Sequence, residues 1–166
     1  MTHTRMLLAT VLSVALLGSA AYAADTTQDQ MSILLDTIRA NRKAFVAVNL
    51  DLSAEEAKGF WPLYDKYQGE LTPISDKVLK LVDEYVDHFS DLKDDRAAEL
   101  MKDYLAADAE RIKVRQSYLP EFSKVVSGRT VARFYQLENK MDAVLRYELA
   151  KTIPVIDEKA APPARK

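Results

Sequence analysis

The chain has 166 residues, with 23 basic side chains, 25 acidic side chains and no cysteine. The near balance of charge argues against a dedicated nucleic-acid binder, and the absence of thiols excludes disulfides and thiolate chemistry. Of its four glycines only Gly59, Gly69 and Gly128 lie beyond the first 23 residues. That number is too small for a β-rich or loop-rich fold, so we expect an all-helical domain.

The first 23 residues have the three-part pattern of a secretory signal peptide. Arg5 precedes an apolar run over residues 6–17, and Ala21 and Ala23 provide the small residues that a signal peptidase requires. The run is shorter than the ~20 apolar residues that a membrane-spanning helix needs, which favours cleavage over a membrane anchor. No cysteine follows the run, so a lipid anchor is excluded. We therefore predict cleavage after Ala23 and a periplasmic protein without stable membrane insertion.

Residues 24–153 are predicted to form one helical domain, and residues 154–166 a disordered tail. The first helix is expected over roughly 29–48, because apolar residues recur there at steps of three and four. This apolar stripe consists of Met31, Leu34, Leu35, Ile38, Phe45 and Val48.

The second helix should begin after Ser53, which with Glu56 forms a capping-box pattern. A regular alternation of four- and three-residue steps then indicates a long helix packed along its length against another. Pro62 and Pro73 fall inside it, and we expect bends there, chiefly at Pro73. The alternating residues are Phe60, Tyr64, Tyr67, Leu71, Ile74, Val78, Leu81 and Tyr85.

A polar turn over residues 88–95 should precede the third helix, with Asp94 or Ser90 as its cap. This helix is expected over about 95–126, with a bend at Pro120. Its predicted apolar stripe, which Asp108 and Arg115 interrupt, is Met101, Leu105, Ile112, Leu119, Phe122 and Val126.

Residues 127–129 resemble a helix stop, with Gly128 as a left-handed cap residue. The fourth helix is expected over about 130–151 and should end before Pro154. Its predicted stripe is Val131, Phe134, Leu137, Met141, Val144 and Leu145. The predicted fold class is therefore all-α: four helices with long, proline-bent central members in a bundle or cradle-like hairpin, without a sheet.

Two segments forty residues apart carry a resemblance to a known family. Leu52-Ser53-Ala54-Glu55-Glu56 resembles the L-T-x-x-Q motif of the Spy/CpxP-like periplasmic proteins, and Leu92-Lys93-Asp94-Asp95-Arg96 keeps its leucine. The resemblance implies an exported helical protein with long bent helices that pair into a cradle-shaped homodimer. It also implies an ATP-independent chaperone, an envelope-stress regulator or a zinc-linked stress protein.

A second likeness covers more of the chain. Phe60-Trp61-Pro62-Leu63-Tyr64, after Glu56-Ala57, and residues 132–140 are similar to motifs of uncharacterised exported helical proteins of Gram-negative bacteria. This likeness implies export and a helical fold but no activity.

No pattern for catalysis or for a cofactor is evident. His88 is the only histidine after residue 23, so a Ser-His-Asp set cannot be assembled around it. Its acidic neighbours would permit a weak cation site, but a lone histidine among exposed acids is usually a solvated turn. The His-rich segments of the zinc-linked members are missing. We therefore predict no enzyme, no metal and no cofactor.

Asp108 and Arg115 are unusual because they lie on or beside the apolar stripe of the third helix. Unpaired charges there would cost several kcal/mol. We favour pairing with Arg133, Glu138 or Arg146 of the fourth helix. The alternative is that this face is not core but an open groove for a client.

The candidate client- or partner-binding residues combine an apolar motif with basic side chains. The motif contributes Phe60, Trp61, Leu63 and Tyr64, which point to several sides of one helix and provide large contact area. Arg111, Arg115 and Arg133 belong to a basic cluster that suits unfolded or acidic segments. Docking of Trp61 and Leu63 against other helices of the same chain is an equal alternative.

Two functions are compatible with these features. The favoured one is an ATP-independent, chaperone-like or envelope-stress binding protein for unfolded envelope proteins, expected as a homodimer. The alternative is a sensor or accessory protein that binds one envelope partner or a metal ion. A purely structural helical protein is a third possibility.

Overall fold

The computed structural model describes residue 37 and residues 40–156, and within these ranges it contains helices and no strand. The prediction of an all-helical, four-helix fold is confirmed. The predicted signal peptide, the start of the first helix with Met31, Leu34, Leu35 and Ile38, and residues 157–166 lie outside the described residues. Residues 40–49 are helical and are called the N-terminal segment below; the later helices are α2 (Ala54–Asp87), α3 (Asp94–Val125) and α4 (Gly128–Thr152).

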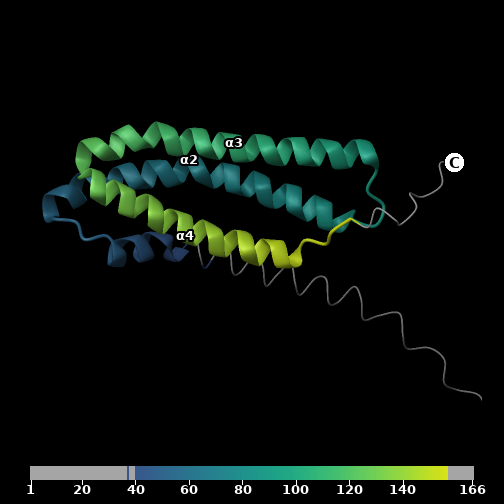
Figure 1. Cartoon of the computed structure of the whole chain (residues 1–166), viewed down its shortest axis with the longest axis horizontal. Helices are drawn as coiled ribbons and strands as arrows, with labels where there is room; N and C mark the ends of the chain where they lie inside the picture. Colours follow the sequence, from purple (N-terminus) through teal and green to yellow (C-terminus); the bar gives the residue numbers. More distant parts are fainter. Residues whose placement is uncertain (1–36, 38–39, 157–166) are drawn as a thin grey trace, which may run out of the picture.

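The three long helices lie roughly alongside one another and form an elongated bundle (Figure 1). α2 and α3 form an antiparallel hairpin, and α4 returns along it after a short connection. α2 starts as predicted, because Ser53 accepts a hydrogen bond from the Glu56 backbone N–H and the Glu56 side chain accepts one from the Ser53 N–H. This reciprocal pair satisfies two amides that have no partner within the helix.

A cluster of aromatic rings forms the centre of the core. Phe60, Tyr64 and Tyr67 of α2 meet Phe122 of α3 and Phe134 of α4, with the Phe122 and Phe134 ring centroids 4.7 Å apart. Edge-to-face and tilted contacts of this kind add to the free energy gained from burying large apolar area. The predicted α2 seam is confirmed at its first five positions, which are buried, whereas Val78, Leu81 and Tyr85 are half-buried.

The buried face of α3 differs in part from the predicted one, of which Phe122 and Val126 are buried. Four residues of the predicted stripe, Met101, Leu105, Ile112 and Leu119, are exposed. The buried residues of the helix are Leu100, Ala107, Tyr118 and Phe122. α3 has apolar residues on two faces, and the face that packs against the aromatic rings of α2 carries Tyr118 and Phe122. The second face remains open to solvent.

The two leucines Leu100 and Leu105 test this assignment, since they differ little in sequence context but are 5% and 58% exposed. We expect Leu100→Ala to lower the free energy of unfolding by about 2–5 kcal/mol, because it leaves a cavity. Leu105→Ala should change it by no more than about 0.5 kcal/mol. Urea unfolding followed by circular dichroism measures both, and equal losses would contradict the assignment.

Two other stripes are corrected in part. In the N-terminal segment Phe45 and Val48 are exposed, and Val46 and Leu50 are buried instead. Val46 and Leu50 are four residues apart and so lie on one side of the helix, which faces the bundle. In α4 the predicted stripe is buried or half-buried except for Val144, which is exposed.

Two predicted helix ends also differ. The N-cap of α3 is Lys93, and no side chain caps it, so neither Asp94 nor Ser90 has that role. Gly128 is the first residue of α4 and lacks the positive φ of a left-handed cap. Ser127 is the N-cap and accepts a hydrogen bond from the Thr130 N–H at 3.2 Å. Residues 127–129, which resemble a helix stop in the sequence, therefore form the N-cap and first residues of α4.

Both central helices continue through their prolines. Pro62 and Pro73 of α2 and Pro120 of α3 all have exposed rings. A proline removes the hydrogen bond to the carbonyl four residues earlier, and on the exposed side water satisfies that carbonyl. Their position on the outer surface explains why α2 reaches 34 residues and α3 reaches 32.

Candidate functional site

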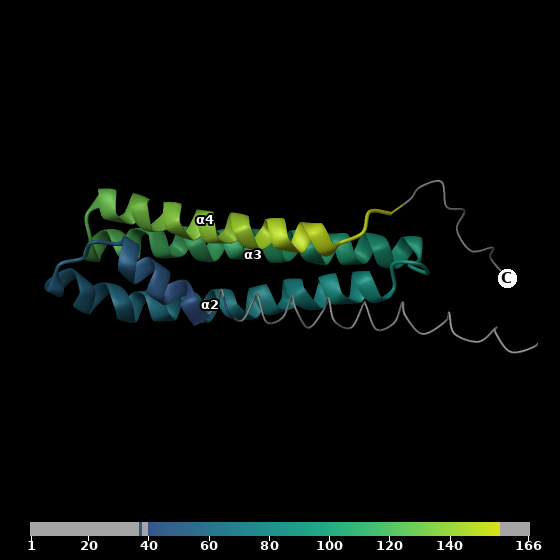
Figure 2. The ribbon, with the colours of Figure 1, turned by 90° about the horizontal axis from the view of Figure 1, so that it is seen from below.

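A groove lies between α2 and α4 because their backbones stay apart, although Phe60, Tyr64 and Tyr67 of α2 contact Phe134 of α4. No Cα atom of α2 lies within 8 Å of a Cα atom of α4. At the end where α2 begins, the N-terminal segment lies between them (Figure 2). Its Lys43 binds Asp65 of α2 at 2.6 Å, and its Arg42 binds Asp142 of α4 at 2.6 Å. Beyond these contacts the described residues leave the space open.

The groove has a volume of about 650 Å³, within the range of small-molecule sites. Its α2 wall runs from Tyr64 to Val82, roughly 27 Å at the helical rise of 1.5 Å per residue. At the far end the Tyr85 hydroxyl donates a hydrogen bond to the Pro154 carbonyl at 2.8 Å, which ties the end of α2 to the chain after α4. Within the described residues, the groove is therefore bounded at both ends and open along its side.

The two ends of the groove differ in polarity. Near the N-terminal segment the walls carry charged residues, while the opposite end is apolar. The apolar end is formed by Val78, Leu79, Val82, Leu149, Ala150 and Ile153, with Tyr104 from α3. Such a gradient would orient any bound molecule that has one polar end and one apolar end.

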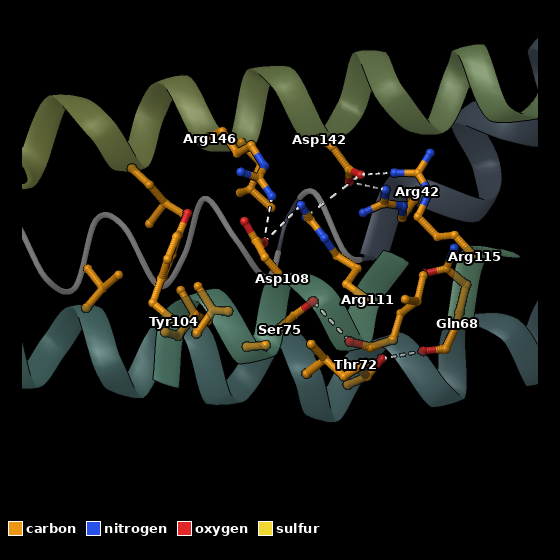
Figure 3. A pocket seen from close by; sticks show the side chains of 18 of the residues that line it. Arg42, Gln68, Thr72, Ser75, Tyr104, Asp108, Arg111, Arg115, Asp142 and Arg146 are labelled. Atoms are coloured by element: carbon orange, nitrogen blue, oxygen red, sulfur yellow. Dashed lines mark hydrogen bonds and ion pairs between the residues drawn. The ribbon is translucent and has the colours of Figure 1, made fainter. Parts of the chain in front are cut away.

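A network of ion pairs forms the charged part (Figure 3). Asp108 of α3 binds Arg146 of α4 at 2.8 Å and Arg111 of its own helix at 3.2 Å. Asp142 of α4 binds Arg115 of α3 at 3.0 Å as well as Arg42. The prediction that Asp108 and Arg115 are paired is confirmed, although Arg115 pairs with Asp142 and not with Glu138. Both residues also line the groove. The two side chains that form ion pairs are therefore also the ones that border an open groove.

Glu138 is the buried centre of this network, with 1% of its surface exposed. Arg42 donates two hydrogen bonds to its carboxylate, each of 3.1 Å, and Gln68 and Tyr67 donate longer ones. Burial raises the pKa of Glu138, and the charge of Arg42 opposes this rise. Glu138 could have been recognised from the sequence, because it lies four residues after Phe134 on the apolar face of α4.

Two polar atoms that line the groove lack a hydrogen-bond partner among the described residues. They are the hydroxyl of Tyr64 and the Nε atom of Arg111, and both atoms are buried. Burial also raises the pKa of Tyr64, so its hydroxyl remains a proton donor at neutral pH. Unpaired buried donors are uncommon because each costs free energy.

The predicted client-binding residues occupy three different environments. Phe60 and Tyr64 are core residues, although Tyr64 also forms part of the groove wall. Arg111 and Arg115 line the groove, and the guanidinium of Arg115 stacks on the Tyr135 ring at 5.5 Å. Sequence reasoning thus identified three of the lining residues, but it missed Arg42, Asp142 and the whole apolar end.

Trp61, Leu63 and Arg133 lie outside the groove. Trp61 is half-buried, with an edge contact to Phe60 at 5.1 Å and the ammonium group of Lys43 over its ring at 5.5 Å. Leu63 is half-buried against the core. Arg133 donates a hydrogen bond to the Asn49 carbonyl at 2.7 Å. Trp61 and Leu63 are therefore partly packed against other helices of the same chain, which was the alternative to a client-binding role.

The region of His88 has no arrangement of metal ligands. His88 is exposed, and its Nδ1 atom lies 3.7 Å from Asp91. Across the part of the chain that the structure describes, no three histidine, aspartate or glutamate side chains come together as a metal site would require. In the same part of the chain, no helix has the length and apolar character needed to cross a bilayer.

Comparison with known proteins does not indicate a function, so a functional proposal rests on the fold and the groove. No family model, no curated protein and no solved structure matches this chain. The resemblance to the Spy/CpxP-like proteins therefore stays a prediction from short motifs.

Proposed function

We propose that this chain is an exported, ATP-independent, chaperone-like binding protein that shields apolar segments of envelope proteins in the groove between α2 and α4. The observation that carries the proposal is the polarity of this groove: an open apolar end joined to a charged end. Periplasmic location rests on the predicted signal peptide, and no nucleic-acid partner is proposed.

The apolar end would supply the affinity for a client. Burying the aliphatic side chains of a client against Val78, Val82 and Leu149 releases about 25 cal/mol per Å² of apolar surface. No nucleotide is needed, because binding to the unfolded state lowers the concentration available for aggregation by mass action. The charged end would speed the encounter with acidic segments and would favour one orientation of the client.

A homodimer remains part of the proposal. Met101, Leu105, Ile112 and Leu119 form an exposed apolar stripe on α3, and such stripes commonly mark contacts between proteins. The same stripe would serve the second candidate function, a sensor or accessory protein with one dedicated envelope partner. Several unrelated clients competing for one site would favour the chaperone-like protein over the accessory protein.

Val82→Gln should weaken client protection. We expect residues 24–166 to suppress light scattering of a denatured, aggregating protein at near-stoichiometric amounts without ATP. In Val82→Gln, about ten times more protein should be needed for equal suppression, because losing a buried valine contact costs about 1.5 kcal/mol. The matched control is Val144→Gln, since Val144 is exposed on α4 and does not line the groove.

This control separates the groove from the rest of the surface. Equal loss of suppression in the two valine variants would place the client elsewhere. No suppression by the unmodified chain with several unrelated clients would rule out the chaperone-like function and leave the accessory protein.

A further inference from the structure

The charged part of the groove contains more guanidinium groups than carboxylates. Among the described residues, four guanidiniums face three carboxylates, so these residues leave one excess positive charge there at neutral pH. Lys43 and Asp65 also line the groove, but they form an ion pair with each other, so their charges cancel. The guanidiniums are those of Arg42, Arg111, Arg115 and Arg146, and the carboxylates are those of Asp108, Glu138 and Asp142.

Arg111 is the member of this set with unused donor capacity. Its Nε atom is buried and has no hydrogen-bond partner among the described residues. Its other nitrogens make the two longest ion pairs of the network, 3.2 Å to Asp108 and 4.0 Å to Asp142. Arg111 projects from α3 toward the groove beside Arg146 (Figure 3). A carboxylate accepts hydrogen bonds from a guanidinium in a forked geometry, so one bound at Arg111 would balance the excess charge.

The apolar end begins immediately beyond this arginine pair. From Ser75, which lies across the groove from Arg111 in Figure 3, to Tyr85 at the far end, α2 rises roughly 15 Å. The walls over this distance are mainly aliphatic, with Val78, Val82 and Leu149 among them. This apolar part continues from the cationic part, and the whole groove of about 650 Å³ lies within the range of small-molecule sites.

We propose that the groove binds a single-chain carboxylate amphiphile of the fatty-acid class. Its carboxylate lies at Arg111 and Arg146, and its alkyl chain lies along the apolar end toward Tyr85. An amphiphile with a cationic head would be repelled by the excess positive charge at this position. One with a neutral head would leave that charge without a counter-ion. This binding shares the groove with the proposed client function but is measured without a client, so either proposal can fail alone.

Calorimetric titration of residues 24–166 with decanoate, kept below its micelle concentration, tests the proposal. We expect saturable binding of one decanoate per chain. Decan-1-ol should bind about tenfold more weakly or worse, because it forfeits a charge-assisted hydrogen bond. Decyltrimethylammonium should show no saturable binding. Equal affinity for decanoate and decan-1-ol, or the absence of saturable decanoate binding, would overturn the proposal.

Variants at two positions separate the head contact from the chain contact. Arg111→Met should weaken decanoate binding about tenfold and leave decan-1-ol binding unchanged, while Val82→Gln should weaken both. Asp108 keeps Arg146 as its partner in Arg111→Met, and circular dichroism verifies that the variant is folded. Arg111→Lys retains the charge without the forked geometry and should give an intermediate affinity. Decanoate binding by folded Arg111→Met at the affinity of the unmodified chain would refute the proposed head site.

Discussion

Arg42→Met is expected to lower the free energy of unfolding by about 3–5 kcal/mol, because it leaves the carboxylate of Glu138 buried without its ion-pair partner. Methionine keeps much of the length of the arginine side chain, so the lost charge dominates the effect. Urea unfolding followed by circular dichroism measures the loss. The double variant Arg42→Met/Glu138→Met should recover most of it, since an apolar pair of similar size removes the buried charge.

Lys43→Met is the matched control. Lys43 also binds a carboxylate, that of Asp65 at 2.6 Å, but both side chains are about half exposed. Exposed ion pairs contribute little, so we expect a loss of no more than about 1 kcal/mol. Equal losses in Arg42→Met and Lys43→Met would contradict a special role for the buried carboxylate.

The stability deficit of Arg42→Met should also depend on pH. Burial raises the pKa of Glu138 in the folded state, and Arg42 opposes that rise, so removing Arg42 raises this pKa further. Between the unfolded and folded pKa values the folded chain holds a proton that the unfolded chain has released. Stability therefore falls as pH rises through this window and recovers as pH falls. We expect the deficit relative to the unmodified chain to shrink on acidification, and a deficit that grows would contradict this sign.

Phe60→Ala should cause a loss of similar size through a different mechanism. Phe60 is 0% exposed, and its ring contacts those of Trp61, Tyr64, Phe122 and Phe134. Removing it opens a cavity where all three long helices meet, which typically costs about 3–5 kcal/mol. Thermal and urea unfolding should both show the loss, with α2, α3 and α4 unfolding together.

Phe45→Ala is the matched control, because it makes the same truncation at an exposed position. Phe45 lies in the N-terminal segment and is 40% exposed. Its truncation should cost less than about 1 kcal/mol, since little cavity is created. A loss at Phe45 as large as that at Phe60 would show that the N-terminal segment packs more tightly than described.

The ends and main apolar seam of α2 were predictable because they depend on neighbours within a few residues. Ser53 and Glu56 cap each other, and the seam from Phe60 to Ile74 lies along one side of one helix. Such local hydrogen bonds and helical periodicity are encoded in adjacent residues. The all-helical class followed from the same signals, together with the scarcity of glycine and the absence of cysteine.

The groove was only partly predictable. Asp108 and Arg115 drew attention as charges beside an apolar stripe, and Arg111 as part of a basic cluster. Arg146 was among the predicted partners of Asp108, whereas Asp142 was not predicted for Arg115. The contacts of Arg42 could not be predicted, because it meets Glu138 and Asp142 across about a hundred residues of sequence. No periodicity within one helix encodes a contact between two helices that are distant in the chain.

The helical segments and the start of α2 follow from the sequence alone, because capping and periodicity act over a few residues. Tertiary packing determines that Leu100 is buried and Leu105 exposed, since both faces of α3 carry apolar residues. Tertiary packing also places Lys43 and Arg42 of the N-terminal segment against α2 and α4 at one end of the groove and leaves the other end apolar. Packing between distant segments sets both outcomes, because size, shape and buried charge are matched only when the helices meet.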